Sequence, residues 1–253
     1  MLTSQIEAPP RAAGARLTYG SRGKIGMMLP SGNVAAEAQI AHMAPEGVSL
    51  HTTRLRLTGS TLEDLMGMTQ GVEEAAALLV DAEVDVVAFH CTGVSTISEE
   101  LEASILQRVA SVAKGRRVTA TSQAIVAALN ALGARRIVML TPYIAEINRR
   151  EVAFLARRGF ETLHEVGLDI AAARDMISVP PERWAALTRE NARADADAYF
   201  ISCTAVRSLE VVESLEAELG KPVVTSNQAM AWHAMRTIGV NDRLEGFGRL
   251  FDL

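Results

Sequence analysis

Two cysteines stand at matching places in the chain, and both have the surroundings of a reactive thiol. Each follows a short apolar run and precedes a threonine, Cys91 in the segment VDVVAFHCTG (84–93) and Cys203 in ADAYFISCTA (196–205). They are the only cysteines in the 253 residues, and they lie 112 positions apart (203 − 91). A thiol placed where a strand ends and a helix begins can act as a nucleophile or as a proton donor and acceptor.

The same offset of 112 residues relates other parts of the chain. The apolar run 25–30 (IGMMLP) corresponds to the run 137–142 (IVMLTP), and each ends in proline. The repeat therefore predicts two halves of one architecture, with a thiol at the same place in each. A single buried cysteine is more often a small apolar core residue, but two in equivalent positions of a repeat favour a functional role.

Apolar runs alternate with helix-like segments from residue 24 onward. Strands are expected at 24–30, 48–57, 84–90, 117–121, 136–141, 161–168, 198–202 and 222–225. Helices are expected at 34–43, 61–82, 99–114, 124–132, 144–158, 181–194 and 209–219. Near-continuous apolar strands separated by helices are typical of parallel sheets covered on both faces.

The predicted fold is α/β, with two pseudo-symmetric lobes. Each lobe is expected to contain a mainly parallel sheet of about four strands, with the active site in the cleft between the lobes. Residues 1–22 are expected to form a flexible N-terminal arm, residues 23–132 the first lobe and residues 133–253 the second. The C-terminal segment of the second half is free to cross back to the first lobe.

Composition narrows the classes of function. The chain is 49% apolar and 22% charged, with a net charge of −5 and no basic stripe, which argues against nucleic acid and anionic membranes as partners. No apolar run approaches the roughly 20 residues that cross a bilayer, and the N-terminus lacks the apolar core of a secretory signal, so we expect a cytoplasmic protein. Without CxxC or HxxxH spacing or a glycine-rich phosphate loop, we expect neither a metal nor a nucleotide cofactor.

The loops at the carboxyl ends of the strands carry small polar side chains. If the two halves face each other, these loops converge on one cleft, where hydroxyls and amides can hold a carboxylate. A helix N-terminus beside each cysteine can lower the thiol pKa, although the sequence does not give the pKa values themselves. The loop-end set consists of Ser31, Asn33, Ser122, Thr141, Tyr143, Thr204, Ser226 and Asn227.

Two further polar residues adjoin the cysteines. Strand alternation directs the ring of His90 away from the side chain of Cys91, so we expect His90 to support the site rather than to react. Arg207 lies four positions after Cys203, and three roles stay open for it: pairing with a substrate carboxylate, capping its neighbourhood, or a subunit contact.

Several short motifs together resemble the aspartate/glutamate racemase superfamily, and within it the branch of maleate cis-trans isomerases and arylmalonate decarboxylases. The resemblance runs from about Lys24 to Val240. The motifs are PSGN (30–33), HCTG (90–93), TSQA (121–124), TPY (141–143), SCT (202–204) and PVVTSNQA (222–229).

The resemblance implies a cofactor-independent enzyme that binds a small carboxylate between two lobes. Cys91 would be the nucleophile or one base, and Cys203 the acid or the other base. Asn33 and Tyr143 would bind a substrate carboxylate. Thr92, Ser122 and Thr204 would add hydroxyl or backbone contacts, and Ser31, Gly93 and Ala205 complete the expected binding set. A homo-oligomer, dimeric or tetrameric, is also expected.

Both cysteines being present disfavours a typical arylmalonate decarboxylase, because that branch typically keeps only the second thiol. The resemblance implies a cis-trans isomerase of a small dicarboxylate, working by thiolate addition, rotation and elimination. A racemase or epimerase of the aspartate/glutamate type is the alternative, followed by a decarboxylase-like enzyme and by a non-catalytic binding protein. The maleate isomerases carry an asparagine after the middle strand of the second lobe, where this chain reads GLDIAAAR (167–174). The substrate therefore stays open between maleate, a related dicarboxylate and an amino-acid-derived acid.

Overall fold

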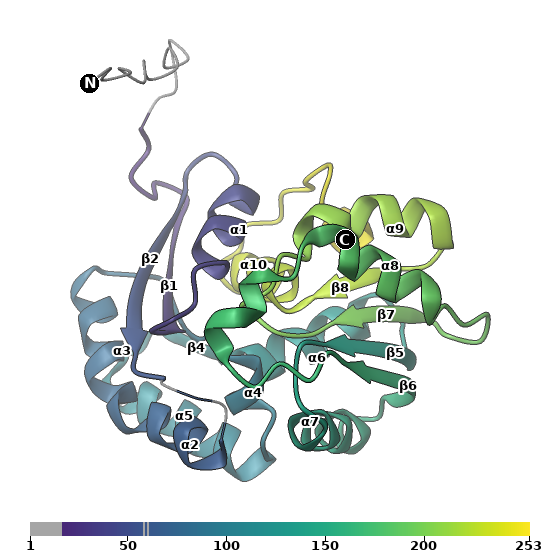
Figure 1. Cartoon of the computed structure of the whole chain (residues 1–253). Helices are drawn as coiled ribbons and strands as arrows, with labels where there is room; N and C mark the ends of the chain where they lie inside the picture. The colour runs from purple at the N-terminus through teal and green to yellow at the C-terminus, as the bar shows by residue number, and fades with distance from the viewer. Residues whose placement is uncertain (1–16, 58, 60) are drawn as a thin grey trace, which may run out of the picture.

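The computed structural model describes residues 17–57, 59 and 61–253 and contains two four-stranded parallel sheets flanked by helices (Figure 1). Residues 1–16 of the expected N-terminal arm lie outside this range. The strand order is β2-β1-β3-β4 in the first sheet and β6-β5-β7-β8 in the second. The strands are β1 (Gly23–Pro30), β2 (Val48–Leu55), β3 (Val86–Phe89), β4 (Arg117–Ala120), β5 (Arg136–Thr141), β6 (Glu161–Gly167), β7 (Ala198–Ile201) and β8 (Val223–Thr225).

Helices connect successive strands, as parallel pairing requires. None of the helices in the described part of the chain is long and apolar enough to cross a membrane. The α-helices are α1 (Ala36–Met43), α2 (Leu62–Met68), α3 (Val72–Asp81), α4 (Thr92–Ser95), α5 (Glu99–Val112), α6 (Thr121–Ala131), α7 (Ala145–Arg157), α8 (Pro181–Glu190), α9 (Val212–Leu219) and α10 (Ser226–Thr237). The 3-10 turns are η1 (Thr69–Gly71), η2 (Ala173–Ser178), η3 (Leu209–Val211) and η4 (Arg249–Asp252).

One expected helix is divided. The sequence predicted a single helix over residues 61–82, but the structure has α2, the turn η1 and then α3. The hydroxyl of Thr69 donates to the carbonyl oxygen of Met66 at 2.8 Å, which tightens the backbone into a 3-10 turn. The two helices can then take different directions over the first sheet.

The internal repeat is visible in the strand register. Residues that correspond in the repeat also have corresponding partners on the two neighbouring strands of their sheet. The first sheet pairs Ile25 with Leu50 and Val86, and the second pairs Ile137 with Thr162 and Ala198, each residue 112 positions beyond its counterpart. The two-lobed α/β fold expected from the repeat is therefore confirmed.

Matching aspartates fix the start of the central strands in both sheets. Asp85 accepts a hydrogen bond from the backbone N–H of Lys24 at 2.8 Å. Asp197, 112 positions later, accepts one from the backbone N–H of Arg136 at 2.7 Å. Each carboxylate thus joins two neighbouring strands at the end remote from the cysteines.

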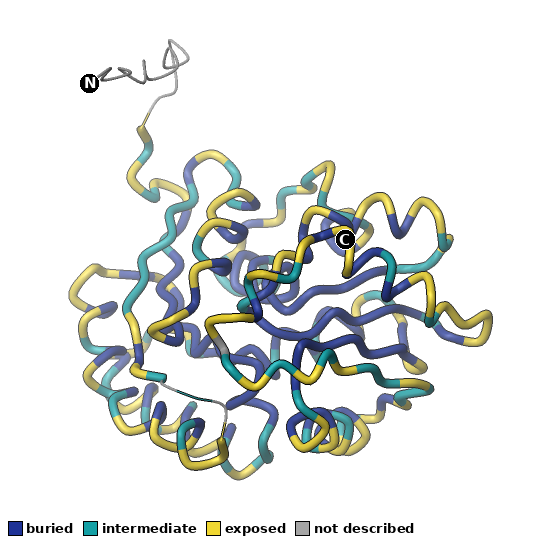
Figure 2. Tube along the Cα trace, viewed as in Figure 1, coloured by how far each residue is buried: buried dark blue, intermediate teal, exposed yellow. Residues whose placement is uncertain are grey.

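The two sheets share their hydrophobic core. One cluster of buried side chains includes Ile25 and Val86 from the first sheet together with Ile137 and Phe200 from the second. Helix α10 follows β8 of the second sheet but packs against α1, α6 and strand β1. Figure 2 shows the buried strands at the centre of the molecule and exposed residues around its rim. Because the core is continuous, the loops at the strand ends are held in a fixed relation.

Candidate active site

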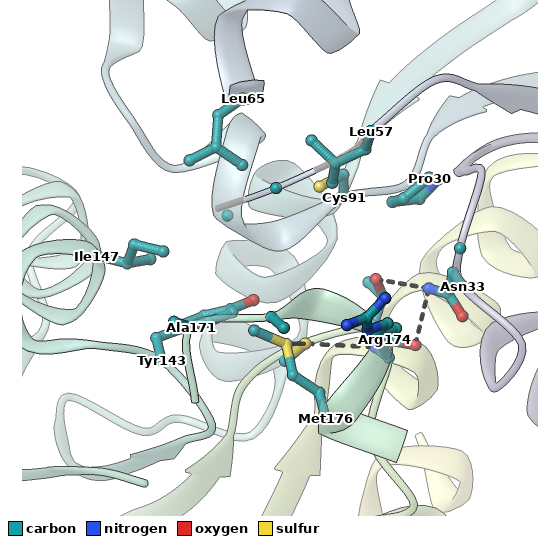
Figure 3. A pocket seen from close by; sticks show the side chains of 17 residues that line it. Pro30, Asn33, Leu57, Leu65, Cys91, Tyr143, Ile147, Ala171, Arg174 and Met176 are labelled. Atoms are coloured by element: carbon teal, nitrogen blue, oxygen red, sulfur yellow. Dashed lines mark hydrogen bonds between the residues drawn. The ribbon is translucent and has the colours of Figure 1, made fainter. Parts of the chain in front are cut away.

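A cavity of about 520 Å³ lies between the two sheets, at the carboxyl ends of their strands. Seven of the ten residues predicted for the site line it: Cys91, Cys203, Asn33, Gly93, Tyr143, Thr204 and Ala205. Figure 3 looks into this cavity and shows Cys91 with Leu57 and Leu65 on one side, and Tyr143 with Met176 on the other. The described residues contain no group of three or more His, Cys, Asp or Glu that could hold a metal ion.

Cys91 connects strand β3 to the short helix α4. It is the N-cap residue, with φ −150° and ψ 110°, so its backbone is extended and unstrained. Its side chain is buried, and the backbone N–H groups of Gly93 and Val94 act to lower the pKa of its thiol. The turn therefore presents the thiol to the cavity with backbone donors behind it.

Cys203 occupies the equivalent place after β7, but its backbone is unusual. Its φ of 97° lies in the left-handed region that residues with a Cβ rarely adopt. Its backbone N–H donates to the hydroxyl oxygen of Ser226 at 3.1 Å, which holds this conformation. The sulfur accepts the N–H of Ala205 at 3.3 Å and lies 3.7 Å from the sulfur of Met176.

Burial controls the protonation of both thiols. It raises the pKa of Cys91 to about 12 and that of Cys203 to about 11. Backbone N–H groups act in the opposite direction at both sulfurs, but desolvation is the larger effect. A helix N-terminus can lower a thiol pKa, but helix α4 begins directly after Cys91 whereas no helix begins directly after Cys203. Both cysteines are therefore protonated at neutral pH.

Tyr143 stands beside the second thiol. Its side chain is 5% exposed, and its hydroxyl lowers the pKa of the nearby Cys203 thiol. Burial raises the pKa of Tyr143 well above its ordinary value, and the nearby Cys203 raises it further. The phenol therefore stays protonated and acts as a donor.

Asn33 joins the two halves of the chain across the cavity wall. Its Nδ2 donates to the carbonyl oxygen of Thr204 at 3.1 Å and to the hydroxyl of the same residue at 2.9 Å. Its Oδ1 accepts the backbone N–H groups of Ala35 and Ala36, each at 3.0 Å. Both amide hydrogens are thus engaged, so Asn33 must release Thr204 in order to bind a ligand.

Three predicted binding residues lie behind the cavity wall. Ser31 is exposed, and its Oγ accepts the backbone N–H of Leu57 at 3.1 Å. Thr92 is buried and donates to the Oγ of Ser226 at 3.0 Å. Ser122 is buried and donates to the carboxylate of Glu102. Of the three, Thr92 connects the two cysteine loops, because Ser226 also accepts the backbone N–H of Cys203.

His90 belongs to a buried network that also crosses between the halves. Its Nδ1 lies 3.0 Å from the hydroxyl of Thr121, and its Nε2 lies 2.8 Å from Oδ1 of Asn227. The amide of Asn227 donates to Gln39 at 2.8 Å and to the carbonyl oxygen of Thr204 at 3.1 Å. Burial lowers the pKa of His90 to about 4, so the ring is neutral. His90 does not line the cavity, and a supporting role for it stays a prediction.

Glu151 is a buried acid behind Cys203 that the sequence did not single out. It lies on helix α7, and its carboxyl oxygens are 2.7 and 2.9 Å from the hydroxyl of Ser202, the residue before Cys203. Burial raises the pKa of Glu151 to about 7. Its charge in turn raises the pKa values of Cys203 and Tyr143.

The sequence also missed several residues that line the cavity on both sides. These residues follow the edge strands β2 and β6 or lie on nearby helices. Most of them are apolar, so their side chains gave no sign of a binding role in the sequence. They are Leu57, Leu65, Ile147, Ala171, Ala172, Arg174 and Met176. Arg207, for which three roles stayed open, does not line the cavity and lies 3.7 Å from the carboxylate of Glu210 on the surface.

Comparisons with known proteins place the whole fold in one family. A family model described as arylmalonate decarboxylase matches residues 25–251. The maleate isomerase of Nocardia farcinica is 28% identical over 238 residues, which cover 90% of this chain and 94% of that protein. The arylmalonate decarboxylase of Bordetella bronchiseptica is 30% identical over 247 residues, covering 95% of this chain and 90% of that protein.

Solved structures agree with the sequence matches. The Nocardia farcinica maleate cis-trans isomerase bound to TRIS has a TM-score of 0.85 at 27% identity, covering 90% of this chain and 97% of the other. A cysteine-to-serine variant of that enzyme, with a covalently bound succinylcysteine intermediate, has a TM-score of 0.84 at 26% identity, covering 90% and 98%. A structure of arylmalonate decarboxylase has a TM-score of 0.77 at 27% identity, covering 90% and 99%.

The raised pKa of Glu151 predicts a pH-dependent effect on stability. Folded Glu151 loses its proton at about pH 7, whereas its ordinary value is 4.5. The contribution of Glu151 to the free energy of unfolding is therefore complete below pH 4.5. As pH rises through 7 this contribution is lost, and the free energy of unfolding falls by roughly 3 kcal/mol. Glu151→Gln cannot ionise, so its free energy of unfolding relative to wild type should increase by about that amount between pH 4.5 and 8.

Urea unfolding of both proteins at several pH values measures this difference. His90, whose depressed pKa has the opposite effect, is present in both proteins and cancels. The exposed Glu182→Gln is the matched control and should give a difference that hardly changes with pH. A pH-independent difference for Glu151→Gln would contradict the assignment.

The positive φ of Cys203 predicts that glycine is a more stable replacement than alanine at this position, which is the reverse of the usual order. With φ at 97°, Cys203→Gly should be more stable than Cys203→Ala by about 1 kcal/mol, because glycine adopts this region without strain. At Cys91, with φ −150°, the order should reverse. Denaturant unfolding of the four variants tests this, and the same order at both sites would refute the strain argument.

Proposed function

The chain belongs to the arylmalonate decarboxylase family, and we propose that it is a cofactor-independent cis-trans isomerase of a small unsaturated dicarboxylate such as maleate. The observation that carries the proposal is the placement of Cys91 and Cys203, at equivalent strand ends, on the walls of one cavity. The solved relative with a succinylcysteine intermediate supports a covalent route, because succinyl is what remains when a thiol adds across the double bond of maleate.

Isomerisation needs the double bond to be removed for a time, since rotation about it is otherwise blocked. In the proposed addition, the sulfur of Cys91 bonds to one alkene carbon, and the thiol of Cys203 protonates the other. The proton that leaves Cys91 restores Cys203, so the two residues together add one S–H across the double bond. After rotation about the new single bond, the reverse steps release the trans acid and both thiols.

The residues around the two thiols support Cys91 as the nucleophile and Cys203 as the proton donor. Tyr143 lowers the pKa of Cys203, and its hydroxyl would stabilise Cys203 as a thiolate after that residue has given up its proton. Gly93 and Val94 offer backbone N–H groups that favour the anionic form of Cys91. We propose that Asn33 and Thr204 bind one carboxylate by exchanging their mutual hydrogen bonds for bonds to the ligand.

Proton NMR in heavy water with maleate tests the proposal. Wild-type protein should form fumarate, and Cys91→Ala and Cys203→Ala should each slow this by more than about 100-fold. Thr188→Ala, which removes a buried hydroxyl far from the cavity lining, is a control for general damage to the fold and should retain turnover.

Other outcomes point to other members of the superfamily. Deuterium at the α-carbon of aspartate or glutamate would replace the isomerase with a racemase, because two-base transfer must exchange that hydrogen. Turnover of maleate that persists in Cys91→Ala would contradict the covalent route.

A second candidate is decarboxylation of a substituted malonate, favoured by the apolar wall of the cavity. Leu57, Leu65, Ile147 and Met176 line a space large enough for an aryl or alkyl group. Loss of carbon dioxide leaves a carbanion that the thiol of Cys203 can protonate, and this step does not require Cys91.

Phenylmalonate distinguishes the two reactions. If the chain is a decarboxylase, Cys91→Ala should retain release of carbon dioxide while Cys203→Ala loses more than about 100-fold. No release by the wild-type protein would exclude this second candidate.

A further inference from the structure

Arg174 is the one charged residue among the lining residues that the structure describes. The other lining side chains are apolar or carry a thiol, hydroxyl or amide group. A dicarboxylate brings two negative charges into this space. Placing them there without a counter-charge is costly, because a buried anion loses its hydration.

The polar groups of the inner cavity are already engaged with one another. Asn33 uses both amide hydrogens on Thr204, and the N–H of Ala205 is directed at the sulfur of Cys203. Exchange of the Asn33–Thr204 contacts can provide donors for one carboxylate. A second carboxylate needs another donor, and it needs one that carries charge.

Arg174 lies on the turn η2, at the rim of the cavity. Its side chain is 87% exposed, and its contact with Asp175 is long at 3.7 Å, with that carboxylate also exposed. An exposed pair at this distance contributes little, so the guanidinium can turn to a ligand at low cost. Figure 3 shows Arg174 between Asn33 and Met176 in that view.

The turn η2 is held close to the reacting groups. Met176, two residues after Arg174, places its sulfur 3.7 Å from the sulfur of Cys203. The loop before η2 is tied to the Tyr143 segment by hydrogen bonds from Leu168 N–H to the carbonyl oxygen of Thr141 at 3.0 Å and from Ile170 N–H to that of Pro142 at 2.9 Å. The backbone that carries Arg174 is therefore held close to Cys203, while its side chain stays free to turn.

We propose that Arg174 binds the second carboxylate of the substrate and so makes the site selective for dicarboxylates over monocarboxylates. This inference rests on the proposed function, because it names the partner of a substrate group in that same cavity. The planar guanidinium can donate two parallel hydrogen bonds to a carboxylate, which fixes both its position and its orientation. With the other carboxylate at Asn33 and Thr204, the double bond would be held between the two thiols.

Binding of two unreactive acids tests the inference without turnover. Succinate and succinamate differ in one group, a carboxylate replaced by an amide. Calorimetry on the full chain should show that wild type prefers succinate, and that Arg174→Gln reduces this preference about tenfold. Arg174→Lys should keep part of the preference, since it restores the charge without the planar pair of donors.

Two controls separate a lost charge contact from a disturbed fold. Arg183→Gln removes the same charge from an arginine that pairs with Glu190 on the surface of α8 and does not line the cavity, and it should leave the preference unchanged. The rate at which iodoacetamide modifies the two cysteines without ligand should be the same in Arg174→Gln and wild type. That result would show that η2 still covers Cys203.

Three results would overturn the inference. They are an unchanged preference in Arg174→Gln, an equal loss in Arg183→Gln, and no binding of succinate by the wild-type chain. Failure of the proposed function is a separate result. A protein that binds succinate through Arg174 but forms no fumarate from maleate keeps the carboxylate site and loses the isomerase assignment.

Discussion

The site depends on a buried set of hydrogen bonds that joins the two halves of the chain. Asn33 from the first half contacts Thr204 from the second, and Asn227 links Thr204 to His90. Each of these groups is buried, so breaking one bond would leave unpaired polar atoms inside the protein. The network therefore fixes the register of the two strand ends that carry the thiols.

The architecture was predicted correctly from the sequence because the internal repeat indicates two halves with the same order of strands. An offset of 112 residues relates Ile25 to Ile137 and Cys91 to Cys203, and the same offset holds in the strand pairing. The helix expected over residues 61–82 was wrong in one respect, since a side-chain bond from Thr69 to the backbone is not visible in an apolar pattern. Local chemistry of this kind becomes clear only once the backbone is placed.

The site was predictable where polar residues follow strands, and less so elsewhere. Asn33, Tyr143 and Thr204 line the cavity as expected, whereas Ser122 instead bonds Glu102 behind the wall. Sequence alone does not show on which side of a loop a hydroxyl lies. The thiol pKa values could not be predicted either, because burial is the largest influence on them and its extent is not visible in the sequence.

The raised pKa values of the two thiols also affect how fast the cysteines are oxidised in air. Peroxide and molecular oxygen attack the thiolate far more readily than the thiol, so a cysteine that is almost wholly protonated oxidises slowly. Cys91 and Cys203 are both buried and are not joined in a disulfide. Burial that keeps both sulfurs protonated therefore also slows their oxidation.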